Sequence, residues 1–148
     1  MSEPVILTAM QTVTARFQGI AVAAGYHTDL GATVRTGWPR ALIAGHDVTL
    51  PVTALHPDTD ARDSGHGAAV RATRRVAVEV IAWHQETSPE WLDRALYDIR
   101  RALIGVADQT DGVITAETGD AEWSEIEDTG LVRLIVPVIL TYADRYGA

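Results

Sequence analysis

The residues best suited to chemistry lie in one polar segment, His56 to Gly67, which holds two histidines, three aspartates and a serine. Carboxylates and imidazoles at this density are able to ligate a hard or borderline divalent cation. The spacing of Asp58, Asp60 and Asp63 does not match a calcium loop, because the bidentate glutamate is missing at the expected offset. The two histidines also lack the H-E-x-x-H spacing of a zinc protease. A metal-dependent enzyme that uses residues 56–66 therefore stays open only as a minor alternative.

Other catalytic patterns are weaker still. Asp63, Ser64 and His66 are too close in sequence to adopt the geometry of a Ser-His-Asp relay easily, and no G-x-S-x-G elbow is present. Neither the Walker pattern nor G-x-G-x-x-G occurs. The absence of cysteine excludes disulfides, thiolate metal sites and cysteine nucleophiles. We therefore expect no catalytic residue, no cofactor and no metal ligand, and a protein that is not an enzyme.

Length and charge narrow the class of protein further. The 148 residues suit a single domain, residues 1–148, and the hydrophobic content of 47% with 22% charged residues is typical of a globular chain. The net charge is -8, and eight carboxylates without any Arg or Lys fall between Asp108 and Asp128. Such a surface repels phosphate, so tight non-specific binding to DNA is not expected. No apolar run approaches the length of a membrane span, and Met1–Pro4 lack the basic start of a signal peptide, which indicates a cytosolic origin.

Hydrophobic periodicity places the elements that must carry these residues. Residues 4–24 repeat apolar side chains every three or four positions, which predicts an amphipathic helix. Ser88 as N-cap and Pro89 at the first helical position begin a second helix, which Gly105 ends. Its charged residues, Asp98 among them, are assigned mostly to the side opposite its apolar stripe. Strands are expected at 32–37, 41–44, 48–55, 74–84, 112–117, 121–126 and 131–142.

Two features of this pattern carry further expectations. Pro137 interrupts the last strand, so we expect a bulge or an unpaired edge there. Residues 56–70, rich in Gly and Asp, are expected to form a long polar loop. The element order, helix, three short strands, a long strand, helix, then further strands, favours an α+β fold. In that fold a mainly antiparallel sheet carries two amphipathic helices packed on one face.

Several segments together resemble one protein family. The leading helix carries Ile6-Leu7-Thr8-Ala9-Met10 and ends before Gly25-Tyr26, and a central strand from Arg75 to Trp83 leads into the helix Trp91–Leu103. The chain closes with a strand that ends in Leu140-Thr141-Tyr142-Ala143-Asp144-Arg145-Tyr146-Gly147. This arrangement, over nearly the whole chain, resembles the tail-terminator (tail-completion) proteins of long-tailed bacteriophages and prophages.

The resemblance implies a structural role in a virion. It implies a small α/β subunit that forms a homohexameric ring, caps the tail tube, stops its polymerisation and joins it to the head–neck complex. The implied partners are copies of the chain itself, the tail-tube protein and a head–tail connector or neck protein, with DNA passing through the ring without specific binding. The implied location is the virion tail, assembled in the host bacterial cytoplasm.

A set of charged and aromatic residues is the candidate interface of such a ring. Arginine pairs and loop carboxylates are suited to ion pairs between subunits, and a tryptophan among acidic residues is suited to an exposed contact. The candidates are Asp58, Asp60, Arg62, Asp63, Arg74, Arg75 and Trp123. Two alternatives remain besides the metal-dependent enzyme: a head–tail adaptor or neck protein of the same virion, and a module that binds a small ligand in an apolar cavity.

Overall fold

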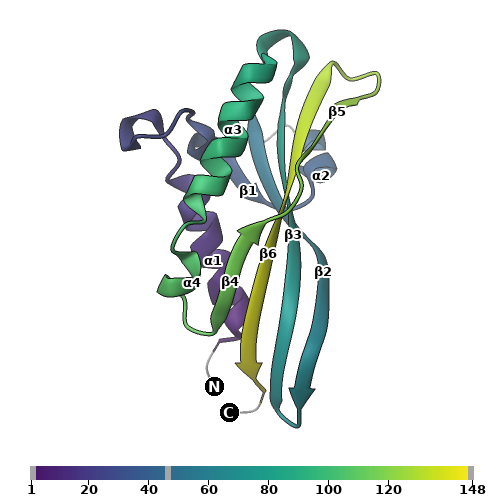
Figure 1. The fold of residues 1–148 in the computed structure, drawn as a ribbon. Helices are drawn as coiled ribbons and strands as arrows, with labels where there is room; N and C mark the ends of the chain where they lie inside the picture. Colours follow the sequence, from purple (N-terminus) through teal and green to yellow (C-terminus); the bar gives the residue numbers. More distant parts are fainter. Residues whose placement is uncertain (1–2, 46–47, 147–148) are drawn as a thin grey trace.

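A six-stranded sheet with its two long helices on one face forms the protein in the computed structural model, which describes residues 3–45 and 48–146 (Figure 1). The strand order is β1-β2-β3-β6-β4, and β5 pairs with β6 on the same side as β4. The strands are β1 (Val34–Thr36), β2 (Val52–His66), β3 (Ala69–Trp83), β4 (Val113–Thr118), β5 (Glu122–Ile126) and β6 (Leu131–Arg145). The α-helices are α1 (Val5–Gln18), α2 (Pro39–Ala44), α3 (Pro89–Ala102) and α4 (Val106–Gln109). Short 3-10 turns η1 (Val22–Ala24), η2 (Leu30–Thr33) and η3 (His84–Glu86) join them. The prediction of an α+β fold with a mainly antiparallel sheet is confirmed, since only the β1–β2 pair is parallel.

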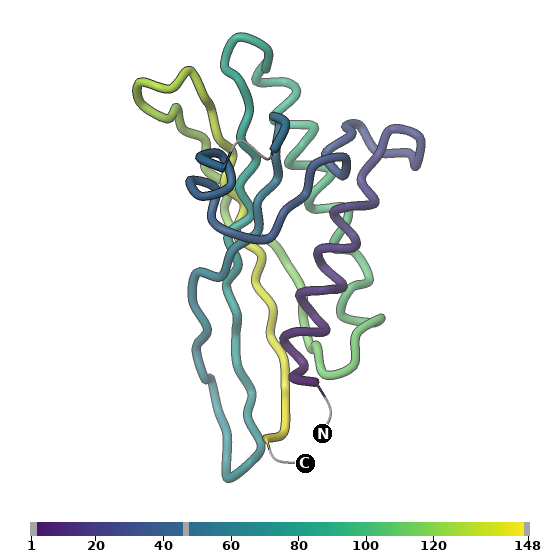
Figure 2. The backbone as a smooth tube through the Cα atoms, turned by 180° about the vertical axis from the view of Figure 1, so that it is seen from behind, coloured from purple at the N-terminus to yellow at the C-terminus, as the bar shows by residue number. Residues whose placement is uncertain are grey.

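Helices α1 and α3 cover one face of the sheet, as the one-sided patterns predicted (Figure 2). Helix α1 buries Ala9, Val13 and Phe17 completely, and α3 begins where Ser88 accepts a hydrogen bond from the Trp91 amide at 3.2 Å. Alternate residues of β3 meet these helices and form most of the core with β6. The core therefore lies between the helices and the sheet, and it leaves the opposite face of the sheet only partly covered.

The partly covered face has a small apolar cluster of its own at one end. Val52, Ile81 and Leu131 are buried there, and Ile43 of α2 packs against them. The prediction of a strand at 41–44 is wrong, because these residues belong to helix α2, which begins with Pro39 in its first turn. Proline at the first helical position favours a helix over a strand.

The first helix is shorter than predicted. It ends at Gln18, and residues 19–24 turn away through Gly19 and a 3-10 turn that ends at Gly25, whose φ is +93°. Ile20, which continues the three-to-four-residue spacing of the apolar stripe, is buried although it lies outside the helix, whereas Ala24, the next position of the stripe, is exposed. Periodicity thus placed the buried side chain correctly and the end of the helix wrongly. The strand expected at 32–37 is correspondingly shorter, because η2 occupies its start.

The polar loop predicted at 56–70 is the largest correction. Strand β2 continues to His66, the chain turns at Gly67 with φ +63°, and β3 begins at Ala69. All of β2 beyond His56 is exposed, so alternation of apolar and polar residues is absent there and the sequence gives no strand signal. Pairing with β3, which in turn pairs with β6 along its whole length, supplies the order that the local sequence does not. We call residues 58–75 of this hairpin the arm (Figure 1).

Pro137 lies in β6 at a position where its lack of an amide hydrogen does not interrupt the sheet. It pairs with Ala77 of β3 without a shift in register, so the predicted bulge does not occur on that side. Its carbonyl accepts a hydrogen bond from the Gly119 amide at 2.9 Å, at the point where β4 has ended and β5 has not begun. The unpaired edge that the proline predicted is thus the gap between two edge strands. Gly147, the last residue of the closing strand in the family resemblance, lies outside the described residues.

No helix among the described residues is long and apolar enough to span a membrane.

Candidate assembly surface

The arm brings six of the seven candidate interface residues together. Across its two strands, the Arg74 Nε lies 2.7 Å from Asp60 Oδ2, and the Arg75 Nε lies 3.4 Å from Asp58 Oδ2. The Thr73 hydroxyl donates to Asp63 Oδ2 at 2.5 Å. Each of the three aspartates therefore has a partner on β3, and these contacts hold the two strands of the arm in register. The ion pairs are solvent-exposed to different degrees, so their contribution to stability is small.

Tyr142 fixes the arm to the last strand. Its hydroxyl donates to Asp60 Oδ2 at 2.8 Å, on the same face of the sheet as the helices. Burial, followed by the hydrogen bond to Asp60, raises the pKa of Tyr142 to about 12. Asp60 thus accepts hydrogen bonds from both Arg74 and Tyr142, which joins β2, β3 and β6 at one point.

Two arginines of the arm keep their charge available. Arg62 on β2 and Arg71 on β3 are exposed, and neither forms an ion pair with another residue of the described part of the chain. Trp123, the seventh candidate, is not part of the arm. It lies on β5 opposite Leu134 and is half exposed.

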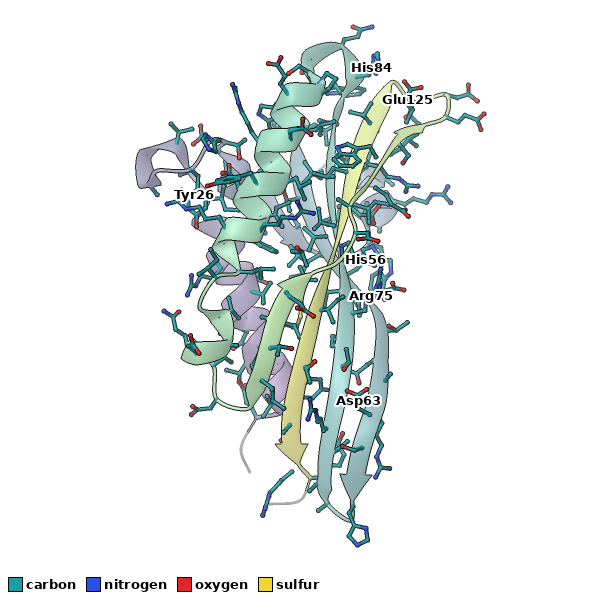
Figure 3. All side chains as sticks on the ribbon, viewed as in Figure 1. Tyr26, His56, Asp63, Arg75, His84 and Glu125 are labelled. Carbon is teal, nitrogen blue, oxygen red and sulfur yellow. The ribbon has the colours of Figure 1, made fainter. Side chains whose placement is uncertain are left out.

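The geometry opposes the metal-dependent alternative for residues 56–66. His56 lies at the base of the arm and His66 at its tip, and the ten residue steps that separate them span roughly 30 Å in a strand. Figure 3 shows the same separation in part, with His56 at the base and Asp63 farther along the arm. Within residues 3–45 and 48–146, no three His, Asp or Glu side chains gather as a metal site would require.

A polar row that sequence reasoning missed crosses four strands at the base of the arm. His56 Nε2 lies 2.6 Å from Glu79 Oε2, Arg133 Nη1 lies 3.4 Å from Glu79 Oε1, and Arg133 Nε donates to Ser124 Oγ at 2.8 Å. Trp38 stacks on the His56 ring with the centroids 5.8 Å apart. The available signal was Glu79 itself, the only carboxylate inside the apolar run of β3. The row ties β2, β3, β6 and β5 together beneath the exposed Trp38.

A buried carboxylate on α3 was also missed. Asp98, assigned by periodicity to the polar side, is fully buried and accepts hydrogen bonds from the amides of His27 and Thr28 and from the Thr28 hydroxyl. The three shortest of these donor distances are 2.7, 2.8 and 3.1 Å. A buried charge needs such partners, because desolvation without them is costly. Asp98 thus fixes the segment that follows α1, and Arg101 supports it with a 2.6 Å hydrogen bond to the Gly25 carbonyl.

The opposite edge of the sheet is acidic. The eight carboxylates between Asp108 and Asp128 are all exposed, and they lie on α4, β4, β5 and the connections around them. Glu125 alone among them lies within ion-pair distance of a described basic group, His84 Nε2 at 3.6 Å, as their neighbouring labels in Figure 3 indicate. One side of the sheet therefore carries arginines on a protruding hairpin, and the other side carries unneutralised carboxylates.

Comparison with known proteins finds a similar fold but no similar sequence. No protein-family model matches the chain, and no curated protein matches it in sequence. A solved structure, described as the virion of a native gene transfer agent (GTA) particle, contains a chain that superimposes with a TM-score of 0.61. The match covers 89% of this chain and 92% of that one, at 14% sequence identity. The two chains share a fold.

Proposed function

We propose that this protein is a structural component of a virion and that it acts as its tail terminator. In this role, copies of the chain form a ring that caps the tail tube, stops its polymerisation and joins it to the head–neck complex. The observation that carries the proposal is the fold shared, over nearly the full length of both chains, with a chain of a gene transfer agent virion. The family-like segments of the sequence supply the specific role at the end of the tail.

The surface supports a role in assembly. The outer side of the arm and the outer sides of β4 and β5 have no strand partner among the described residues, so two sheet edges are available to other chains. Large exposed aromatic residues, Trp38, Trp83, Trp123, Tyr97 and Tyr146, offer further contact area. The residues best suited to chemistry are instead used in pairing the strands of the arm.

The charge of the chain supports passage of DNA. With a net charge of -8 and an acidic edge that carries eight exposed carboxylates, a ring of this chain presents phosphates with few cationic partners. Phosphate neutralisation dominates the affinity of non-specific DNA binding. A ring of this composition therefore lets DNA move through it without retaining it.

Tube length is the direct test of the role. The purified protein is added to the tail-tube protein of the same virion, and tubes are measured by electron microscopy with and without it. A terminator produces short tubes with an additional ring at one end, in proportion to the amount added. Tubes that grow to the same length in its presence rule out the terminator role.

The same purified protein also distinguishes a tail terminator from a head–tail adaptor or neck protein. A head–tail adaptor binds the connector of the capsid and leaves tube growth unchanged, whereas a terminator binds the end of the tube. Binding to isolated capsids but not to tubes assigns the protein to the neck. Mass measurement then reports the ring, since a hexamer has six times the 16.0 kDa of the chain.

A further inference from the structure

We propose that the ring is closed by edge-to-edge pairing of strands: the arm segment Thr59–Arg62 of one copy pairs antiparallel with β4 of the next copy. The inference rests on the proposed ring and names the two surfaces that meet in it. It makes the sheet continuous from subunit to subunit and uses two different edges of the same chain. A contact between different surfaces is heterologous, and it forms a ring when the rotation between copies closes.

Both edges are free at the required place. Strand β1 pairs only with residues 53–55 of β2, so the outer side of β2 has no strand partner from the arm onward. The pairing of β2 with β3 has irregularities at Asp58 and Asp63, and the residues between them, 59–62, form a regular strand. On the opposite side of the sheet, β4 pairs only with β6, and its outer side faces no described strand.

The two segments lie at the same height in the sheet. Thr59 pairs with Arg75, Arg75 with Ile139, and Ile139 with Glu117, so Thr59 and Glu117 occupy the same level on opposite edges. The same succession of partners connects Ala61 to Thr115 through Thr73 and Thr141. A neighbour related by rotation about an axis parallel to the strands therefore presents its β4 beside the free part of β2.

The direction of the strands also agrees. Three antiparallel pairings separate β2 from β4, so the two strands run in opposite directions within one chain. Rotation about an axis along the strands preserves direction, and the new pair between copies is therefore antiparallel. Antiparallel pairing is also the arrangement of every neighbouring pair in this part of the sheet.

The charges of the two edges favour pairing of the arm with β4 over pairing of two identical edges. The arm carries four arginines against three aspartates, and the aspartates already have partners on β3. The stretch around β4 and β5 carries eight exposed carboxylates and no Arg or Lys. Two acidic edges repel each other, whereas an arginine-bearing edge attracts an acidic one. The surplus charge of the arm, with Arg62 on the edge strand β2 and Arg71 one strand inside it on β3, thus lies on the side of the sheet that meets the acidic edge of the neighbour.

Disulfide trapping tests the pairing, because the natural chain has no cysteine. Ala61→Cys and Thr115→Cys are introduced into one full-length chain, both at exposed positions on the same face of the sheet. Three strand spacings, about 14 Å, separate the two positions within one chain, too far for a disulfide inside the subunit. Mild oxidation should give a ladder of linked subunits that ends at the size of the ring, even if the free ring is sparsely populated.

The controls distinguish other contacts. Each single variant should give no linked product alone, and an equal mixture of the two should give linked dimers. A dimer formed by Ala61→Cys alone indicates two-fold pairing of β2 with β2 and overturns the proposal. The matched pair Ala61→Cys with Ser124→Cys, which places the second thiol on β5 at the height of Val52, should not link.

Two further readouts keep the result interpretable. Circular dichroism and thermal unfolding confirm that each variant is folded before oxidation. A folded double variant without any ladder at high concentration overturns the pairing, whatever its effect on tube length. If tubes are capped normally while no ladder forms, the proposed function stands and the inference fails; if a ladder forms while tubes grow unchecked, the inference stands and the terminator role fails.

Discussion

Tyr142 of β6 and Asp60 of β2 lie on strands that β3 separates, and the Tyr142 hydroxyl nevertheless donates to the Asp60 carboxylate at 2.8 Å. The contact crosses β3, whose Arg74 donates to the same carboxylate oxygen. It adds a side-chain link between β2 and β6 to the backbone pairing of β3 with both strands. An edge that is to meet a neighbouring subunit benefits from such a link, because less conformational entropy is lost when the contact forms.

Replacing Tyr142 with Phe should lower the free energy of unfolding by about 1.5–3 kcal/mol, the usual value of a hydrogen bond to a charged group. The loss should depend on pH. Because the folded pKa is about 12 against an ordinary value of 10.0, the contribution of the hydroxyl is complete below pH 10.0 and is lost as pH rises toward 12. Urea unfolding of both proteins across this range measures the difference. Parallel pH profiles of the natural chain and the variant would contradict the assignment.

Asp98→Ala should destabilise the protein by about 2–4 kcal/mol, because it leaves two amides and a hydroxyl of His27 and Thr28 without their acceptor. Asp93→Ala, an exposed position on the same helix, is the matched control and should change stability by less than about 0.5 kcal/mol. Denaturant unfolding compares the two. Equal effects would mean that the hydrogen bonds of Asp98 contribute nothing beyond helix propensity.

Gly31→Ala should be poorly tolerated for steric reasons. A Cβ at this position would lie 2.3 Å from the Gln18 carbonyl oxygen and 2.7 Å from that of Ile20, and backbone atoms cannot yield cheaply. We expect a loss of about 2–3 kcal/mol. Gly67→Ala at the tip of the arm meets nothing within 4 Å and suffers only from its φ of +63°, so about 1 kcal/mol is expected. Melting temperatures in the reverse order would refute this account of the two glycines.

Neutralising the acidic edge near β4 should weaken self-association. The double variant Asp111→Asn with Glu117→Gln removes two carboxylates from the surface that meets the arm of the neighbour, and we expect an association constant roughly tenfold lower. Glu127→Gln with Asp128→Asn removes the same charge from the turn between β5 and β6 and should leave association nearly unchanged. Analytical ultracentrifugation at low and high salt measures both, and the natural chain should dissociate as salt rises. Equal weakening by the two double variants would show that only net charge matters.

The sequence alone determined the parts of the fold that have local causes. The alternation of valines in residues 76–82 predicted the central strand, and the Ser88-Pro89 start with its apolar stripe predicted helix α3, because each pattern follows from the geometry of one element. The α+β class followed from two one-sided helices and several strands, since each helix has to bury its stripe against a sheet.

Tertiary structure decided what depends on distant partners. The β2 half of the arm has no strand signal in its sequence, because both of its faces are exposed and its order comes from pairing with β3 and from the Tyr142 contact. Asp98 is buried although its position and charge predicted a polar face, because backbone donors of a segment 70 residues away compensate for its desolvation. The two open edges, one with arginines and one with carboxylates, belong to segments far apart in the chain, and only the order of strands in the sheet places them on opposite sides at one height.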